Sequence, residues 1–276
     1  MSRPEVPVCL TIGTSDSSGG AGVAGDVKAF ASIGCFAATV IVGVTAQSPG
    51  GVRDRWPVPA DGIEAQLSVV TTELPISAVK IGTTWNADVL TRLHRGLAGV
   101  VDQRIPIVVD PVMVTASGSS LSENGVHDAI VEHLLPLAIV LTPNWQEACA
   151  LAKVEPASGL SRRNIAEAIC GLGASAVVIG ARPEDDGDWF FDGAHHVEIE
   201  HSRHPSAADH GAGCAHSALI TGLLAQRWEL RDAVREAGKR AASGIENGIM
   251  NVGRDVHPVD VLGLAQRGCP PRHRNE

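Results

Sequence analysis

Short runs of Val, Ile and Leu recur along this chain, and each run is followed by a stretch with helical spacing of its apolar residues. The runs predict buried strands at 7–13, 35–44, 77–82, 105–110, 138–143 and 176–180. The stretches between them predict helices at 21–34, 61–73, 87–98 and 123–134, and from 145 and 161. Apolar strands that alternate with helices are typical of a parallel sheet covered on both faces. The chain is therefore predicted to be an α/β protein with three layers, α/β/α, and a mostly parallel central sheet.

The pattern changes after residue 180. Residues 188–201 predict a short β-hairpin, and two long helices are predicted at 213–226 and 230–250. No internal repeat or low-complexity linker interrupts the chain, and its 276 residues fit one large α/β domain. We therefore expect a single domain over residues 1–265, followed by a disordered C-terminal tail at 266–276.

Composition narrows the range of partners. A net charge of −9 argues against nucleic acid and anionic membranes, and the absence of Tyr argues against stacking on bases. No apolar run reaches the roughly 18 residues that a transmembrane helix needs. The first residues lack the apolar core of a signal peptide, and none of the six Cys forms a CxxC pair. The sequence predicts a cytoplasmic protein with reduced thiols and a small-molecule substrate.

Four polar motifs follow predicted strands, where ligands bind in open α/β sheets. They are TSDSSGGAG after the first strand, TAQ after the second, DPVM after 105–110 and TPNWQE after 138–143. The SSGGAG turn lacks the GK[ST] of a P-loop and the GxGxxG spacing of a dinucleotide site. It is predicted to close over one side of a small substrate.

The segment HGAGC (210–214) joins small residues to the start of a predicted helix. The backbone N–H groups of Ala212, Gly213 and Cys214 have no intrahelical acceptor there, and the helix dipole favours negative charge. Together with Gly211, they can form a hole for an anion such as a phosphate. The alternative is an ordinary tight turn between a strand and a helix.

Cys214 adds a reactive group to this turn. A helix N-terminus lowers the pKa of a thiol, so a thiolate is expected near neutral pH. Such a thiolate can take the proton of a substrate hydroxyl while the amides hold a transferring phosphoryl group. The alternative is a small buried Cys without a chemical role.

Asp110, Asn144 and Glu147 supply oxygen ligands after neighbouring strands. Mg²⁺ in proteins is held by one or two carboxylates together with waters and substrate phosphates. The alternative for the N-x-x-E pair is a capping arrangement at a helix start. Four His on the hairpin and after it lack Cys partners at zinc-finger spacing and are expected to be solvated: His195, His196, His201 and His204.

A set of strings, taken in order along the chain, resembles one family. The strings are VCLTIGTSDSSGGAGVAGDVKAFASIG, VTAQ, KIG, DPVMV, TPNWQEA and HGAGCAHSA, and they span about residues 7–250. They resemble the hydroxymethylpyrimidine/phosphomethylpyrimidine kinases of thiamine biosynthesis, in the ribokinase-like superfamily. The resemblance implies phosphoryl transfer from ATP, with Mg²⁺, to the hydroxymethyl group of an aminopyrimidine or a related ring alcohol. It also implies a second transfer to the monophosphate.

The resemblance also implies roles for particular residues and a homodimer. Cys214 would be the base, and Gly211, Ala212 and Gly213 would complete the anion hole. Mg²⁺ would lie at Asp110 and Glu147, and the ATP phosphates at Asn144 and Glu147. The acceptor pocket would comprise Ala21, Asp26, Gln47 and Val112.

The chain departs from the family pattern at several of these places. Thr14 stands where the family usually has Gly, Thr83 where it has Met, and Ala24 where it has Gln. Thr14 and Thr83 are expected to line the acceptor pocket and to change its shape and polarity. The stretch VVIGARP (177–183) lacks a usual Lys, and Arg182 is expected to supply the missing positive charge to ATP. The alternative for Arg182 is a surface residue without such a role.

Two other functions stay open on the sequence. One is a vitamin kinase of the pyridoxal type, which shares the same framework. The other is a catalytically weak relative that binds a pyrimidine or vitamin without transferring phosphate. The lost Lys near residue 180 favours the second, whereas the joint presence of Asp110, Asn144, Glu147 and Cys214 argues against it.

Overall fold

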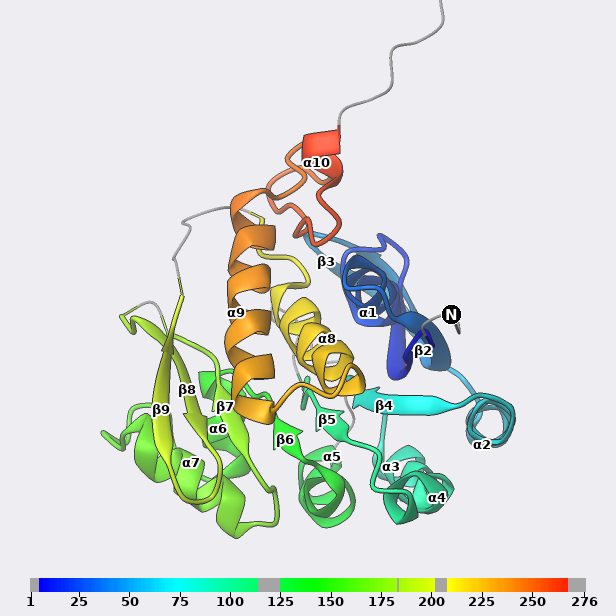
Figure 1. Cartoon of the computed structure of the whole chain (residues 1–276), viewed down its shortest axis with the longest axis horizontal. Coiled ribbons are helices and arrows are strands. Elements are labelled where there is room, and N and C mark those ends of the chain that lie inside the picture. Colours follow the sequence, from blue (N-terminus) through cyan, green and yellow to red (C-terminus); the bar gives the residue numbers. More distant parts are fainter. Residues whose placement is uncertain (1–4, 114–124, 183, 202–207, 268–276) are drawn as a thin grey trace, which may run out of the picture.

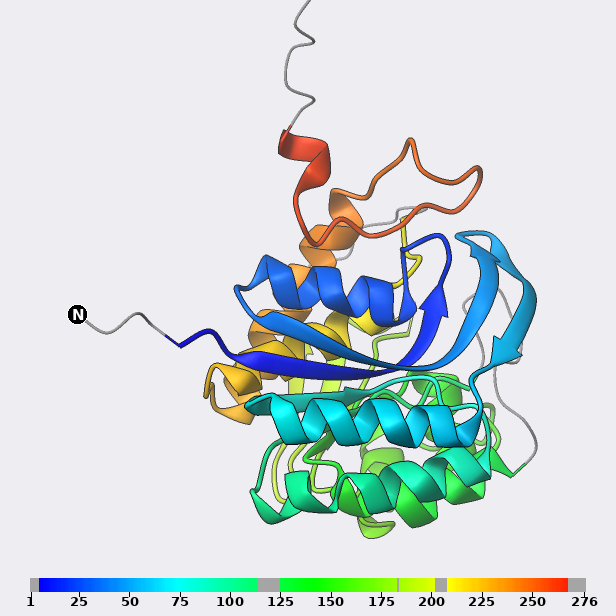
Figure 2. The same cartoon turned by 90° about the vertical axis from the view of Figure 1, so that its right-hand side faces the viewer.

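A computed structural model describes residues 5–113, 125–182, 184–201 and 208–267. Within them, nine strands form one sheet in the order β3-β2-β1-β4-β5-β6-β7-β8-β9. Helices cover both faces of this sheet (Figures 1 and 2). The predicted three-layer α/β/α fold with a mostly parallel sheet is confirmed.

The centre of the sheet is parallel and its edges are antiparallel. The parallel strands are β1 (Val8–Asp16), β2 (Phe36–Ser48), β4 (Ile76–Ile81), β5 (Ile107–Val109), β6 (Val140–Leu141) and β7 (Val177–Ile179). One edge is β3 (Gly51–Pro57), and the other is the hairpin of β8 (Gly187–Phe191) and β9 (His196–Glu200). The hairpin predicted at 188–201 is therefore confirmed.

The helices divide between the two faces. On one face lie α2 (Ala60–Glu73), α3 (Ala87–Gly96), α4 (Ala98–Asp102), α5 (Val126–Ala129), the π-turn η1 (Ile130–Leu134), the 3₁₀ turn η2 (Leu135–Leu137), α6 (Trp145–Leu151) and α7 (Arg162–Gly171). On the other lie α1 (Gly22–Ser32), α8 (Ala212–Ala225) and α9 (Leu230–Glu246). A short helix, α10 (Leu264–Arg267), comes last among the described residues.

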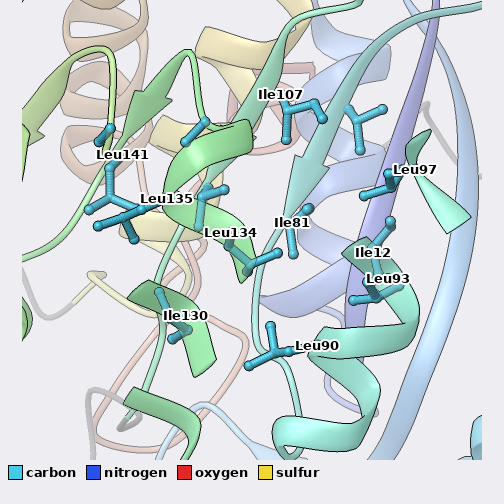
Figure 3. Packing of buried hydrophobic residues seen from close by; sticks show 14 of the residues in the cluster. Ile12, Ile81, Leu90, Leu93, Leu97, Ile107, Ile130, Leu134, Leu135 and Leu141 are labelled. Carbon is cyan, nitrogen blue, oxygen red and sulfur yellow. The ribbon is translucent and has the colours of Figure 1, made fainter. Parts of the chain in front are cut away.

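Each face of the sheet buries its own apolar core. Under α3 and η1, strand residues such as Ile12 and Ile81 meet Leu90, Leu93 and other fully buried aliphatic side chains (Figure 3). Burying one such side chain stabilises the fold by about 1.5–3 kcal/mol. On the opposite face, Phe30 of α1 packs with the apolar residues of α8 and α9. Because both faces are covered, the strands carry the continuous apolar runs that predicted them.

Strand β2 is longer than predicted, and β3 was not predicted. Beyond residue 44 the chain continues as TAQS and returns through GVRDRWP, and the two segments pair antiparallel up to Ser48 and Gly51. Most residues of β3 are exposed or half-buried, so this strand has no apolar run and no clear alternation. Backbone pairing alone makes it a strand, which an apolar pattern does not reveal.

The helix boundaries also differ in detail. The helix predicted at 87–98 is split at Leu97 into α3 and α4, and the helix predicted to reach 250 ends at Glu246. The helix predicted at 123–134 is α5 followed by η1, and its first two residues fall outside the described ranges. Of the tail predicted at 266–276, Gln266 and Arg267 lie in α10 and the rest is outside the described residues. No described helix has both the length and the apolarity to cross a membrane.

Replacing Phe30 by Ala should lower the free energy of unfolding by about 3–5 kcal/mol, because the ring is fully buried and its removal leaves a cavity. Urea titration followed by circular dichroism measures the change. Phe36→Ala is the matched control, because Phe36 is 55% exposed and its loss should cost no more than about 0.5 kcal/mol. Equal losses in the two variants would contradict the core described for this face.

Candidate active site

Helix α8 begins beside the carboxyl ends of the central parallel strands and packs on β1, β4 and β5 (Figure 1). The segments that follow β1, β4 and β5 meet at this edge: Gly82 N–H donates to Ile12 O, and Asp110 N–H donates to Ile81 O. Residues that lie far apart in the sequence are thereby brought to one place, as expected for a ligand site in an open α/β sheet.

Lys80, near the end of β4, is the central charge of this site and is only 1% exposed. Its Nζ lies 2.5 Å from Asp26 Oδ1 and 3.6 Å from Asp110 Oδ2, and it donates to the backbone oxygen of Cys214 at 3.3 Å. Burial by itself lowers the pKa of a lysine, but the charges of Asp26 and Asp110 outweigh it and raise the pKa above its usual range. Lys80 is therefore a permanent cation beneath the start of α8.

The sequence pattern did not predict this role for Lys80. The signal was present, since SAVKIG places one lysine inside an apolar strand, and lysine is almost never fully buried unless it is paired. The sequence could not show which carboxylates pair with it, because Asp26 lies 54 positions away along the chain.

Asp26 was expected in the acceptor pocket, but both of its oxygens have partners within the protein. Oδ1 faces Lys80, and Oδ2 accepts a hydrogen bond of 2.6 Å from Thr11 Oγ1. The carboxylate is 2% exposed. This arrangement favours a role in holding Lys80 over direct contact with an acceptor.

Asp110 and Glu147 are the two predicted metal ligands, and both are buried. Asp110 Oδ2 accepts from Ser217 Oγ of α8 at 2.8 Å. Glu147 forms a capping box with Asn144, with bonds of 2.9 Å and 3.0 Å, so the capping alternative describes part of this geometry. Burial and, secondarily, the nearby charge of Asp110 raise the pKa of Glu147 to about 8.

This pair of acids suits a cation. No group of three or more His, Cys, Asp or Glu side chains poised for a metal occurs in the described ranges. Mg²⁺ does not require such a group, because it keeps waters and shares substrate phosphates. The raised pKa of Glu147 beside Asp110 shows that the two acids repel each other, and a divalent cation between them would relieve that repulsion.

The start of α8 has the backbone shape that the HGAGC segment suggested. Gly211 has a φ of 83°, and a side chain there would collide with the backbone oxygen of Gly20. The N–H of Ala212 donates to Asp209 O at 3.0 Å, so one of the three predicted amides already has a partner. Within the described residues, the N–H groups of Gly213 and Cys214 have no backbone acceptor. Two amides at this helix start are therefore available to an anion.

The pKa expected for Cys214 needs correction. Burial above all, together with the charges of Asp110 and Asp26, raises the pKa of the thiol to about 12, although Lys80 and a hydrogen bond from Gly22 act in the opposite direction. The sequence argument counted the helix N-terminus alone, which favours the thiolate. It did not include burial or the two carboxylates that the fold brings close. In this structure Cys214 is a thiol at neutral pH.

The two glycine-rich loops of the chain lie against each other. Asp16, at the end of β1, accepts from the N–H groups of Ser18 and Ala21 and lies 2.8 Å from His210 Nε2. Burial opposes ionisation of Asp16, but the bonds from His210 and Ser18 lower its pKa below the usual range. A side chain at Gly20 would meet the His210 ring. These contacts hold the SSGGAG turn against the start of α8.

The remaining predicted acceptor residues surround the same edge. Thr14 and Thr83 are buried, and Gly13 lies within ordinary contact distance of Thr83. Gln47 joins the end of β2 to the SSGGAG loop, because its N–H donates to Ser17 Oγ at 2.8 Å and its side chain accepts from Thr45. Half-buried Val112 lies two residues after Asp110. Thr14 lies near the end of β1, and Thr83 and Val112 lie shortly after β4 and β5, so all three come from the carboxyl ends of central strands. Ala21 directly precedes α1.

Arg182 is placed next to the predicted nucleotide residues. Its guanidinium bonds both oxygens of Asp185 at 2.9 Å and lies 4.7 Å from the Trp145 ring centroid. Trp145 follows Asn144 in the chain, so Arg182 brings a positive charge beside the Asn144–Glu147 turn.

The histidines considered for zinc are dispersed among separate acids. His195 lies near Asp192, His196 bonds Glu167 at 3.0 Å, and His201 bonds Asp188 at 3.2 Å. His204 lies outside the described residues.

Solved structures with the same architecture are kinases. The ADP complex of Bacillus subtilis pyridoxal kinase aligns with a TM-score of 0.84 at 28% identity, covering 96% of this chain and 100% of that chain. A phosphomethylpyrimidine kinase from Clostridium difficile 630 aligns with a TM-score of 0.70 at 28% identity, covering 84% and 96%. The fold and the site therefore define a phosphotransferase with the ribokinase-like fold.

The sequence comparison identifies one family within this fold. The family profile described as "Phosphomethylpyrimidine kinase" matches residues 16–260, and the chain belongs to this family. The hydroxymethylpyrimidine/phosphomethylpyrimidine kinase of Rhizobium meliloti (strain 1021) is 37% identical over 236 residues, which are 83% of this chain and 87% of that protein. The family resemblance read from the motifs is confirmed.

Replacing Lys80 by Met should lower the free energy of unfolding by about 3–5 kcal/mol, because it leaves Asp26 buried without a counter-charge. Adding Asp26→Asn should recover at least half of that loss, since the amide is neutral and still bonds Thr11. Denaturant unfolding measures both variants. Arg92→Met removes a cation from a surface pair with Glu64 and should change stability far less. A double variant no more stable than Lys80→Met would refute the pairing argument.

Proposed function

We propose that this protein transfers the terminal phosphoryl group of ATP to the hydroxymethyl group of 4-amino-5-hydroxymethyl-2-methylpyrimidine, and then to the resulting monophosphate. The observation that carries the proposal is the meeting of the α8 start with Lys80 and Asp110 at the ends of the parallel strands. Family membership supports the aminopyrimidine as the acceptor. The protein is further proposed to be a cytoplasmic homodimer, as the sequence predicts.

The chain's own groups provide positioning and charge, which are the main requirements of phosphoryl transfer. The N–H groups of Gly213 and Cys214, with the flexible backbone of Gly211, receive the transferring group. Lys80 lies directly under this turn and adds a fixed positive charge. Asn144 and Arg182 border the opposite side, where the remaining phosphates of ATP would lie.

Asp110 and Glu147 would hold Mg²⁺, and this ion would neutralise charge on the phosphates when bound. Ser217 orients Asp110 through its 2.8 Å hydrogen bond, and the Asn144 backbone orients Glu147. These bonds fix two carboxylates at adjacent positions without using all of their oxygen lone pairs.

Cys214 is proposed to accept the proton of the acceptor hydroxyl. Its thiol is protonated in the free protein, and a protonated thiol is no base, so Cys214 must first release its own proton to solvent. The resulting thiolate then takes the proton of the hydroxyl as the bond to phosphorus forms. A loose transition state places little demand on early proton removal. Lys80 contributes here because its charge lowers the pKa of the Cys214 thiol.

On the acceptor side, Thr14 and Thr83 present hydroxyls near the site, and Gln47 offers both a donor and an acceptor to an aminopyrimidine edge. The structural match to a pyridoxal kinase with a TM-score of 0.84 makes pyridoxal the second candidate acceptor. Family membership and the curated relatives favour the pyrimidine.

The direct test is ATP turnover with three acceptors: the hydroxymethylpyrimidine, its monophosphate and pyridoxal. We expect the highest kcat/KM with the pyrimidine and measurable transfer to its monophosphate. Cys214→Ala should lower kcat by about 100-fold or more while acceptor binding changes little. Turnover of pyridoxal alone would replace the proposed acceptor, and binding without any turnover would show a binding protein instead of a kinase.

The raised pKa of Glu147 predicts how metal use depends on pH. Below its pKa of about 8 the carboxyl holds a proton that Mg²⁺ must displace. The Mg²⁺ concentration for half-maximal turnover should therefore fall by up to about tenfold per pH unit as the pH rises toward that value, and then level off. Glu147→Gln should remove this dependence. The same dependence in both proteins would exclude Glu147 as its cause.

A further inference from the structure

A second buried carboxylate lies outside the centre just described. Asp188, in β8, is 5% exposed and faces two imidazoles. Its Oδ1 lies 3.2 Å from His201 Nε2, and its Oδ2 lies 3.8 Å from His216 Nε2. Both histidines are largely buried, with side chains that are 18% and 15% exposed. The neighbouring charges and the hydrogen bond from His201 lower the pKa of Asp188 despite its burial, so the group is a carboxylate.

Asp188 also holds the loop that follows β7. Its Oδ1 accepts a hydrogen bond of 2.8 Å from the N–H of Ala181. Ala181 directly precedes Arg182, the residue proposed to face ATP. On the other side of Ala181, Gly180 N–H donates to Pro143 O at 3.0 Å, next to Asn144. The loop at 180–182 is therefore fixed from two sides, and Asp188 is one of them.

His216 connects the same carboxylate to α8. It lies two residues after Cys214, in the first turns of the helix whose start is proposed to bind the phosphoryl group. Gly238 of α9 faces both imidazoles, since a side-chain carbon at this position would be in ordinary contact with each of them. One carboxylate thus touches the loop proposed to lie along ATP and the helix proposed to receive its terminal phosphate.

We propose that Asp188 is a positioning residue for the nucleotide: it fixes the loop at 180–182 against α8 through Ala181 and His216. This inference rests on the proposed kinase function. Asp188 reaches both segments, through the hydrogen bond from the Ala181 N–H and the 3.8 Å approach of His216 Nε2, and so sets the distance between them. The nucleotide phosphates must reach both segments. Asp188 itself touches no substrate in this account, and its effect passes through the backbone of Ala181 and the imidazole of His216.

This role predicts that loss of Asp188 weakens nucleotide binding and spares acceptor binding. Asp188→Ala removes both links, and it should raise the dissociation constant for ADP and the KM for ATP about tenfold. The KM for the acceptor should stay within about twofold, because no link from Asp188 leads to the acceptor side. Asp188→Asn still accepts from Ala181 and should recover part of the affinity. General destabilisation would not separate the two substrates in this way.

A double-mutant cycle tests the link to α8. His216→Leu alone should weaken ADP binding, and adding it to Asp188→Ala should cause little further loss if the two residues act through one contact. The matched control is Asp192→Ala, at the other end of the hairpin strand. Asp192 accepts from the N–H groups of Ala194 and His195 and pairs with Arg231 of α9, and no hydrogen bond or ion pair joins it to α8 within the described residues. This control should bind ADP like the wild type.

The measurements are calorimetric titration with ADP and steady-state kinetics on the full chain. If Asp188→Ala does not fold, Asp188→Asn and His216→Leu carry the same comparison. Unchanged ADP affinity in folded variants, or fully additive losses in the cycle, would overturn the inference while leaving the kinase function intact. A wild-type protein that neither binds ADP nor turns over ATP would refute the proposed function and this inference with it.

Discussion

The contact between Lys80 and Asp26 is the constraint on which the site depends. A lysine at 1% exposure is tolerated only with a partner, and Asp26 on α1 provides one at 2.5 Å. The same ammonium reaches Asp110 after β5 and the backbone of Cys214 on α8. One buried cation therefore sets the relative positions of α1, β4, β5 and α8. The cost of burying this charge is offset by its pairing with Asp26 and Asp110.

A second set of contacts closes the site from the side of β1. A side chain at Gly211 would collide with the backbone oxygen of Gly20, and a side chain at Gly20 would collide with the His210 ring. The Asp16–His210 contact holds the two loops at this separation. The glycines thus allow the approach, and that contact fixes it. Close packing of backbone at a phosphate site leaves its amides accessible to the ligand.

Much of the fold could be predicted from apolar pattern, because buried parallel strands must be apolar on both faces. Strand β3 could not be predicted in this way, since GVRDRWP pairs with β2 through its backbone and buries little apolar surface. The site was predicted in part: the motifs at the strand ends marked Asp110, Asn144, Glu147 and Cys214 correctly as neighbours of one edge. Lys80 and the Asp16–His210 pair were missed because their importance comes from partners distant in sequence. The pKa of Cys214 was wrong for the same reason, as the helix terminus is local and the opposing carboxylates are not.

The protonated state of Cys214 has a consequence beyond catalysis. Thiolates react with peroxides and electrophiles far faster than thiols do, because the anion is the nucleophile. A thiol with a pKa of about 12 stays protonated at neutral pH, and therefore reacts slowly as long as no ligand is bound. Burial first, and the two carboxylates second, make Cys214 a reluctant base in the free protein, and the same surroundings keep its sulfur in the less reactive thiol form.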